Sequence, residues 1–437
     1  MKMRRSIALV GVLLMLAAAM TGCTGTTTAA PAADAAATEA SSAEASPAAA
    51  TDEVVTLTVW GDPDNQAIQE ECFNELNALF EEQNPNIKID YQWSGSFDGI
   101  NIALQSDTLP DLFWVQGNKS SAMAEMAASG FLLPLDQFNP DPTGFPQGAI
   151  NYAQVDGVTY CSYPGFIDYA LIYYNVDLFK ANGIEEPQTY SDFVNAMETL
   201  YAAGITPFSL GGDFEWSRYW PTQILCATLA DQDLYRIIDG ETTGEFSQIV
   251  YAFDQFADFC KKGYFGTPAG AMDESSAQLA FSNGKVAMIA EGTWNNSLFT
   301  GLNFEVGRFA LPDETGTRVA QNGYSNFTTY AISSKCKYPE AAWKYVEFMD
   351  SMEALQIAEN YWKGIPAVEG IEVSDPLTAA VSNFQRVGNN IYHVLSNVPT
   401  TSGKPQDVFM SSVLPGLMNG SMTGEEGMQR IIEEMNK

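Results

Sequence analysis

Apolar and polar positions follow two different periods along residues 54–437, and each period predicts one type of element. The apolar run over Val54–Trp60 predicts a strand, and apolar residues spaced three and four apart predict a helix over Ile68–Phe80. Two further strands are predicted over Ile87–Trp93 and Leu109–Val115. Strand, helix and strand at this spacing favour a right-handed βαβ unit in a parallel sheet.

The same mixture of elements continues towards the C-terminus. The segment that starts at Pro187 predicts a helix, with Thr189 as its N-cap and Gly204 at its end. Further helices are predicted over Phe246–Cys260 and Glu340–Glu359. The predicted fold class is therefore α/β.

One predicted strand ends in an unusual group of residues. Val286–Ala290 is an apolar run typical of an interior strand, and Glu291, Gly292 and Trp294 follow it. We expect Glu291 at the carboxyl end of the strand, a sharp turn at Gly292, and Trp294 projecting from that turn. The alternative is that Trp294 is a core residue that closes the end of the strand.

The N-terminal residues have the pattern of an export signal. Lys2, Arg4 and Arg5 precede the short apolar run Ile7–Met20. The next residues, Met20–Cys23, resemble the lipobox of bacterial lipoproteins. This resemblance implies a signal peptide over 1–22, cleavage before Cys23, and a lipid on Cys23. It also implies a location at the outer face of the bacterial cytoplasmic membrane.

Composition separates a linker from a folded region. Residues 23–53 are mostly Ala, Thr, Ser, Pro and acids, so this segment is predicted to be a disordered linker. The chain has 437 residues, of which 46% are hydrophobic, which suffices for two domains or lobes. The formal charge of −33 argues against nucleic acid as a partner. The five cysteines after Cys23 are widely spaced, which favours neither a disulfide framework nor a metal site.

Eight short motifs occur in an order that resembles one protein family. The succession is similar to the extracellular solute-binding proteins of bacterial ABC importers, in the sugar-binding branch related to the maltose-binding proteins. The resemblance covers nearly all of residues 54–437. The motifs are LPDLFWV (109–115), GFLLPLDQF (130–138), VDGVTYCSYP (155–164), IYYNVDLFKANGI (172–184), PQTYSDF (187–193), AAGITPFSLGG (202–212), FSNGKVAMIAEGTW (281–294) and KYPEAAWKYVEFMDS (337–351).

The resemblance implies a two-lobed, periplasmic-binding-protein-like fold in which each lobe is a mostly parallel sheet flanked by helices. A hinge would join the lobes, with the chain crossing near 163–168, 308–312 and 348–351. Lobe one would comprise 54–163 and 311–347, and lobe two would comprise 164–310 and 348–437. The implied partners are a mono- or oligosaccharide and the membrane subunits of an ABC permease, and the implied oligomeric state is a monomer.

Sugars combine apolar ring faces with a rim of hydroxyl groups, so their sites pair aromatic rings with carboxylates and amides. In open parallel sheets such residues follow the carboxyl ends of strands. Glu215 and Trp216 are the choice within the DFEWSRYW segment, with Asp213 and Tyr219 as alternatives, and Asp62 has a competing assignment as a helix cap. The predicted ligand-binding residues are Trp60, Asp62, Trp93, Ser94, Gln116, Glu215, Trp216, Glu291, Trp294, Tyr324 and Trp362.

Two other classes of protein remain as alternatives. A secreted glycoside hydrolase would need two carboxyl groups about 5–10 Å apart, and the chain offers 54 acids. A surface adhesin is the second alternative, but it would not explain the two-lobed pattern. Catalytic triads with serine or cysteine require a histidine, and the chain has only His393. We therefore predict no catalytic residue, and we also predict no cofactor and no metal ligand.

Overall fold

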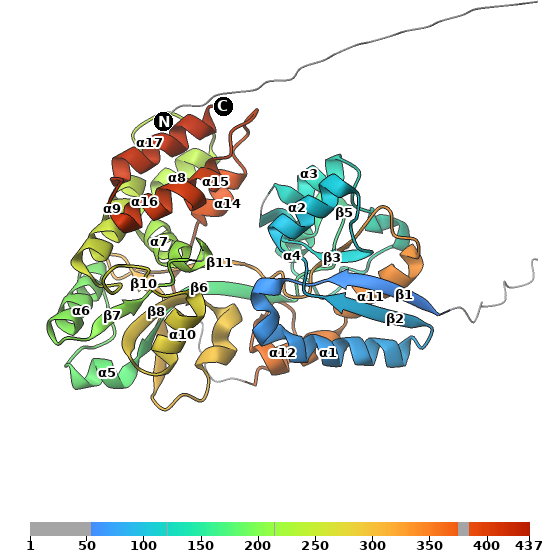
Figure 1. Ribbon diagram of the computed structural model, residues 1–437, viewed down its shortest axis with the longest axis horizontal. Helices are drawn as coiled ribbons and strands as arrows, with labels where there is room; N and C mark the ends of the chain where they lie inside the picture. Colours follow the sequence, from blue (N-terminus) through green and yellow to red (C-terminus); the bar gives the residue numbers. More distant parts are fainter. Residues whose placement is uncertain (1–53, 120, 214, 375–383) are drawn as a thin grey trace, which may run out of the picture. The chain divides into compact units, whose positions relative to one another are not determined.

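The computed structural model describes residues 54–437 apart from 120, 214 and 375–383, and most of its strands belong to two sheets (Figure 1). The predicted signal peptide (1–22), the lipidation site Cys23 and the predicted linker (23–53) lie outside the described residues. Each sheet has its own buried apolar core.

The smaller sheet has the strand order β12-β3-β1-β2. Strand β1 runs parallel to both β2 and β3, which confirms the predicted βαβ unit, and β12 runs antiparallel to β3. Its strands are β1 (Val55–Trp60), β2 (Ile87–Gln92), β3 (Leu112–Trp114) and β12 (Tyr330–Ile332).

Helices and short turns surround the smaller sheet. Helix α1 lies beside α12, blue and orange in Figure 1, and both contribute to the core of this sheet. The elements are η1 (Pro63–Asn65), α1 (Gln66–Gln83), α2 (Phe97–Ser106), η2 (Gly117–Lys119), α3 (Ala122–Ala128), η3 (Leu135–Phe138), α4 (Gln147–Tyr152), the β4 (Gln154–Val155) and β5 (Val158–Thr159) hairpin, α11 (Pro339–Met349) and α12 (Met352–Trp362).

The larger sheet is built around the ten-residue strand β6 and has the order β10-β11-β6-β8-β7, with three more strands attached. All seven residues of β8 are buried, which confirms it as an interior strand. The strands are β6 (Phe166–Asn175), β7 (Thr206–Ser209), β8 (Val286–Gly292), β9 (Val306–Phe309), β10 (Leu311–Pro312), β11 (Arg318–Tyr324), β13 (Ile365–Pro366) and β14 (Arg386–Gly388).

The larger sheet differs from the expected mostly parallel arrangement. Strand β6 runs antiparallel to β8, β9, β11 and β13, whereas β7 is parallel to β8 and β14 is parallel to β11. Strand β6 follows the β4–β5 hairpin with no intervening helix. The four strands that pair with it all come later in the chain and run antiparallel to it, so the larger sheet is mixed rather than mostly parallel.

Helices of the middle and C-terminal parts of the chain complete this half of the fold: α6, α7 and α10 pack on the larger sheet, and α16 and α17 pack against α9. Thr189 forms the predicted capping box with Asp192 at the start of α6. The elements are α5 (Val176–Ala181), α6 (Tyr190–Ala202), α7 (Glu215–Leu229), α8 (Asp231–Ile238), α9 (Ser247–Lys262), α10 (Glu274–Ser282), η4 (Thr293–Phe299), α14 (Ile391–Ser396), α15 (Pro405–Val408), the π-helical turn η5 (Phe409–Val413), α16 (Leu414–Asn419) and α17 (Gly424–Met435).

Two segments lie elsewhere than the predicted lobe division had them. Strands β10 and β11, expected in lobe one, pair with the larger sheet, because β11 hydrogen-bonds along β6. Helix α12, expected in lobe two, buries Leu355 and Trp362 in the core of the smaller sheet. The single helix predicted over Glu340–Glu359 is two helices, because Ser351 caps a new one by accepting a hydrogen bond from the Ala354 amide.

The cysteines after Cys23 are unpaired thiols, and four of the five are buried. Cys72, Cys226 and Cys260 belong to the two cores, as predicted. Burial raises the pKa of the Cys260 thiol to about 12. These residues therefore act as small apolar core residues.

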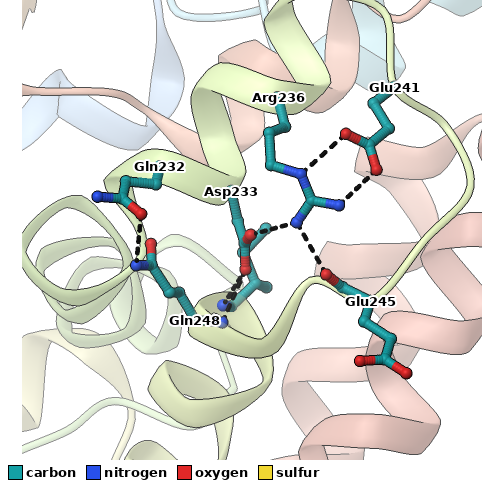
Figure 2. Close-up of polar contacts among 7 residues, drawn as sticks. Gln232, Asp233, Arg236, Glu241, Glu245 and Gln248 are labelled. Atoms are coloured by element: carbon teal, nitrogen blue, oxygen red, sulfur yellow. Dashed lines mark hydrogen bonds and ion pairs between the residues drawn. The ribbon is translucent and has the colours of Figure 1, made fainter.

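A buried carboxylate joins α8 to the start of α9 (Figure 2). Asp233, 4% exposed, accepts hydrogen bonds from the backbone amides of Gln248 (2.7 Å) and Ile249 (3.2 Å). Arg236 donates to Asp233 (2.7 Å) and to Glu241 (Nε to Oε2, 2.8 Å). The carboxylate therefore satisfies two amides at the N-terminus of α9 that the helix itself leaves unpaired.

Replacing Asp233 by alanine is expected to lower the free energy of unfolding by about 2–3 kcal/mol, because the variant loses a helix cap and charged hydrogen bonds. Urea unfolding measures the change. Gln232→Ala is the control, since the exposed Gln232 only accepts from Gln248 Nε2 at 3.3 Å and its loss should cost less than about 0.5 kcal/mol. Equal effects of the two variants would contradict this role of Asp233.

Candidate functional site

A cavity of about 290 Å³ is lined by elements from both halves of the fold. We call it the cleft cavity. Residues after β1 and β3 line it together with residues of β6, α7, α10, η4, β11 and α14. Its aromatic lining residues are Trp114, Trp216, Trp220, Trp294, Phe327, Trp362 and Tyr392.

Three tryptophans from two elements form one wall of the cleft cavity. The rings of Trp216 and Trp220, one turn apart on α7, stack with centroids 6.1 Å apart and 28° between their planes. Trp294, in η4, lies against Trp220 with centroids 4.5 Å apart and a 50° tilt. All three rings are partly exposed. They offer apolar faces of the kind that match the C–H faces of a sugar ring.

Gly292 provides the space that Trp294 occupies. Gly292 is the last residue of β8, with φ −92° and ψ 160°, so its backbone is extended and makes no sharp turn there. A Cβ atom at Gly292 would lie 1.9 Å from Cζ3 of Trp294. The prediction of a sharp turn at Gly292 is therefore wrong, and the glycine is needed because the indole folds back over it.

Replacing Gly292 by alanine is expected to displace the Trp294 ring from its position beside Trp220. Ligand affinity should then fall roughly tenfold, about 1.4 kcal/mol. Titration calorimetry with a sugar that the wild type binds measures this change in affinity. Gly301→Asn is the control, because a Cβ there meets nothing within 4 Å and asparagine tolerates the positive φ (+71°) at this position. Unchanged affinity in Gly292→Ala would show that the ring position does not matter for binding.

Glu291 holds two of the side chains that line the cleft cavity. Its carboxylate is 2% exposed and accepts hydrogen bonds from Gln278 Nε2 (3.1 Å) and Asn295 Nδ2 (2.9 Å). Gln278 and Asn295 line the cleft cavity, whereas Glu291 does not. Burial raises the pKa of Glu291. Glu291 thus orients two amides rather than reaching the cavity itself.

Asp168 brings a buried carboxylate to the cleft cavity. It lies in β6, opposite Gly323 of β11, and is 6% exposed. Its Oδ1 atom has no hydrogen-bond partner within the protein. Burial raises the pKa of Asp168 to about 6, and the nearby Lys119 opposes this rise. A buried oxygen without a partner costs free energy unless something else bonds to it, so a ligand hydroxyl is a suitable donor.

More acids than bases line the cleft cavity. Asp62 caps η1, accepting from the Asp64 amide (3.0 Å) and from Asn65 (2.8 Å), and it also lines the cavity. The pKa of Asp62 is raised to about 6, mainly by burial, and that of Glu274 to about 8, by burial and then by Glu291. Burial lowers the pKa of Lys119. This lining favours ligands that donate hydrogen bonds over anionic ligands.

Five of the eleven predicted ligand-binding residues line the cleft cavity. Trp362 is among them but is 1% exposed, with its ring stacked on Phe327 (4.5 Å, 7°) and its Nε1 donating to the Trp294 carbonyl (2.5 Å). It therefore mainly supports Trp294. The five are Asp62, Gln116, Trp216, Trp294 and Trp362.

The other six predicted residues do not line the cavity. Trp60 donates to Gln92 (3.2 Å), and Trp93 packs edge-on against Phe73. Tyr324 packs against Tyr152. The six residues are Trp60, Trp93, Ser94, Glu215, Glu291 and Tyr324.

The prediction overlooked most of the polar lining. Asp168 had a sequence signal, because it is an acid near the start of an otherwise apolar and aromatic strand. Trp220 lies one helical turn after Trp216, on the same face of α7. No comparable sequence pattern marks the Asn and Gln side chains of the lining, which are spread over five elements. The overlooked residues include Asp64, Asn65, Gln69, Lys119, Asp168, Trp220, Glu274, Gln278, Asn295, Gln321, Ser325, Asn326 and Tyr392. The sequence did not indicate which of Asn389, Asn390 and His393 faces the cleft, and Asn390 and His393 line the cavity.

The single histidine is engaged with the backbone. His393 Nε2 lies 2.7 Å from the Asn118 carbonyl oxygen, and burial lowers the pKa of the imidazole. Over 54–437, apart from the gaps already given, no three or more His, Cys, Asp and Glu residues gather as a metal-ion site would need. The same part of the chain has no helix with the length and apolar character of a membrane span.

Comparison with known proteins identifies the family. Residues 60–356 match the family described as bacterial extracellular solute-binding protein. The chain belongs to this family. It is therefore a solute-binding protein rather than an enzyme, as predicted, and the predicted family resemblance is confirmed.

Individual relatives agree with this assignment. An uncharacterized ABC transporter extracellular-binding protein of Pyrococcus horikoshii is 28% identical over 323 residues, 70% of this chain and 70% of the relative. A maltooligosaccharide ABC transporter solute-binding lipoprotein of Streptococcus pneumoniae is 24% identical over 400 residues, 87% and 86% of the two chains.

Solved structures confirm the fold. A protein studied for xylan utilization by the thermophilic bacterium Caldanaerobius polysaccharolyticus superposes with a TM-score of 0.74 and 21% identity. The match covers 87% of this chain and all of that protein. The predicted periplasmic-binding-protein-like fold is thereby confirmed.

Proposed function

We propose that this solute-binding protein captures a sugar or oligosaccharide in the cleft cavity and delivers it to an ABC permease. The observation that carries the proposal is the pairing, in one cavity, of the Trp216, Trp220 and Trp294 wall with the carboxylate of Asp168, whose Oδ1 has no partner within the protein. Flat rings suit sugar faces and carboxylates suit sugar hydroxyls. The Streptococcus relative is named as the solute-binding lipoprotein of a maltooligosaccharide ABC transporter, which adds support.

In this proposal Trp294 stacks on a sugar ring. The hydroxyl groups of that ring form hydrogen bonds with Asp62, Gln116 and Asp168. Glu291 acts indirectly, through Gln278 and Asn295. Two stacked rings with several charge-assisted hydrogen bonds support an affinity near the micromolar level.

The two sheets support a revised division into lobes. The chain passes from the smaller to the larger sheet between β5 and β6, returns between β11 and β12, and passes again between α12 and β13. We place the hinge in these three short connections, at residues 160–165, 325–329 and 363–364. Lobe one then comprises 54–162 and 328–362, and lobe two comprises 163–327 and 363–437. Closure of the lobes traps the sugar.

The cellular setting of the proposal follows from the N-terminal sequence and the family. The protein would be anchored by a lipid on Cys23 at the outer face of the cytoplasmic membrane, and the linker 23–53 would tether the folded part. We propose that it works as a monomer, with the permease as its protein partner. The Streptococcus relative is named a lipoprotein, which supports the anchor.

Titration calorimetry tests the proposal. The probes are malto-, xylo- and chito-oligosaccharides of one to six residues, at protein concentrations well above micromolar. Saturable heat with at least one series is the expected result. No heat with any of them would contradict sugar binding. We also expect the bound glycan to be recovered intact after prolonged incubation with the protein. Cleavage of the glycan would favour the hydrolase alternative.

A further inference from the structure

A second cavity, of about 480 Å³, lies next to the cleft cavity. One wall comes from residues 117–118, 121, 123–125 and 154–155, and the other from residues 396–406. The turn η2 and the helix α14, with the residues beside them, line both cavities. The two cavities therefore share these two short elements as parts of their walls.

A hydrogen bond joins a lining residue of one cavity to a lining residue of the other. His393 lines the cleft cavity, Asn118 lines the second cavity, and His393 Nε2 is 2.7 Å from the Asn118 carbonyl oxygen. The oxygen can only accept, so the ring donates. A ligand hydroxyl that takes the place of the ring as donor would restore the hydrogen bond to this oxygen.

Two further contacts join the walls of the second cavity. The Ser121 amide donates to Ser396 Oγ (3.2 Å), and Lys404 Nζ lies 3.3 Å from Glu125 Oε1. The charges of Lys404 and Glu125 oppose each other, so this cavity has no strong excess of either sign. It is accordingly suited to an uncharged occupant.

The lining of the second cavity differs from that of the cleft cavity. It consists mainly of hydroxyl, amide and backbone groups, and none of the residues that line it is aromatic. Such a surface offers hydrogen bonds to the hydroxyl rim of a sugar but no ring on which a sugar face can stack. The two cavities therefore complement each other: one holds a sugar by its faces and the other by its edges.

We propose that the second cavity is an extension subsite that receives further residues of a neutral oligosaccharide whose first residues occupy the cleft cavity. This inference rests on the proposed function. A ligand that passes from one cavity to the other displaces the His393 ring from the Asn118 carbonyl. The natural ligand is then a chain longer than the cleft cavity alone can hold.

Affinity measured against chain length tests the inference. The probes are the malto-, xylo- and chito-oligosaccharide series of one to six residues, used with the whole folded protein. In the wild type, affinity should rise at least tenfold, about 1.4 kcal/mol, between the shortest member that binds and the longer ones. Ser121→Trp, which fills the second cavity from one wall, should reduce that ratio to near one. Thr401→Trp tests the opposite wall.

Ser191→Trp is the matched control, because Ser191 is an exposed residue in the first turn of α6 and lines neither cavity. It should keep the wild-type length ratio, and thermal unfolding should show that all three variants fold. An affinity that does not depend on length in the wild type, or a length ratio that survives both Ser121→Trp and Thr401→Trp, would overturn the inference. If no member of any series binds, the proposed function fails as well, which is a separate outcome.

Discussion

Replacing Asp168 by asparagine is expected to weaken sugar binding by about 2 kcal/mol, roughly thirtyfold. The substitution keeps the shape of the side chain but removes the charge from an acceptor that is buried and has no partner for Oδ1. Hydrogen bonds to charged groups contribute more than those between neutral groups. Titration calorimetry with the sugar found in the panel measures the loss.

Asp177→Asn is the matched control for this substitution. Asp177 is exposed in the first turn of α5 and does not line the cleft cavity. Its substitution should leave the affinity within a factor of two of the wild-type value. If Asp168→Asn behaved in the same way, the carboxylate would not contact the ligand.

The raised pKa of Asp168 gives this prediction a pH dependence. The ionised form accepts best, so wild-type affinity should fall as the pH drops below about 6, whereas Asp168→Asn should lack this component. The stability of the ligand-free protein should change with pH in the opposite direction to the affinity. Because folding raises the pKa from 3.8 to about 6, the ionised carboxyl destabilises the ligand-free protein, increasingly as the pH rises through this window. Ligand-free Asp168→Asn should therefore unfold at a higher temperature than the wild type at pH 8, and the difference should vanish near pH 4.

Replacing Trp294 by alanine is expected to weaken sugar binding tenfold or more, by at least about 1.4 kcal/mol. The variant loses the ring that packs against Trp220 at the cavity wall. A stacked ring contributes about 0.5–1.5 kcal/mol beyond the area that it buries. Calorimetry with the same sugar checks the size of the effect.

Trp343→Ala is the control for loss of an indole. Trp343 is also partly exposed, stacks on Phe138 (5.3 Å, 6°) and lies in α11, away from the residues that line the cleft cavity. It should lower the unfolding temperature without changing affinity. Equal affinities of Trp294→Ala and the wild type would remove Trp294 from the site and favour the alternative that it is only a core residue.

The sequence predicted elements well where local pattern and burial agree. Strand β8 is apolar along its length and fully buried, and the capping box of α6 depends on only two nearby residues. Local patterns are weaker guides to partners that are distant in the chain. Strand β11 follows a short connection from β10, and only its hydrogen bonds along β6 assign it to the larger sheet.

The candidate site was predictable in kind but only partly in detail. Trp216 and Trp294 line the cavity as expected, because aromatic residues near strand ends and helix starts suit an open cleft. Glu291 was expected in the cleft but turns inwards, because Gln278 and Asn295 supply hydrogen bonds that satisfy its buried carboxylate. No spacing rule in the sequence could indicate which of these three polar residues faces the ligand.

We expect a sugar to bind between the wall of Trp216, Trp220 and Trp294 and the carboxylate of Asp168. A crystal structure of the protein with a bound oligosaccharide would decide this. The expected complex has a sugar ring lying flat on Trp294 or Trp220, with a ring hydroxyl within hydrogen-bond distance of Asp168 Oδ1. A sugar bound elsewhere, with Oδ1 of Asp168 left without a ligand contact, would show that these residues do not form the binding site.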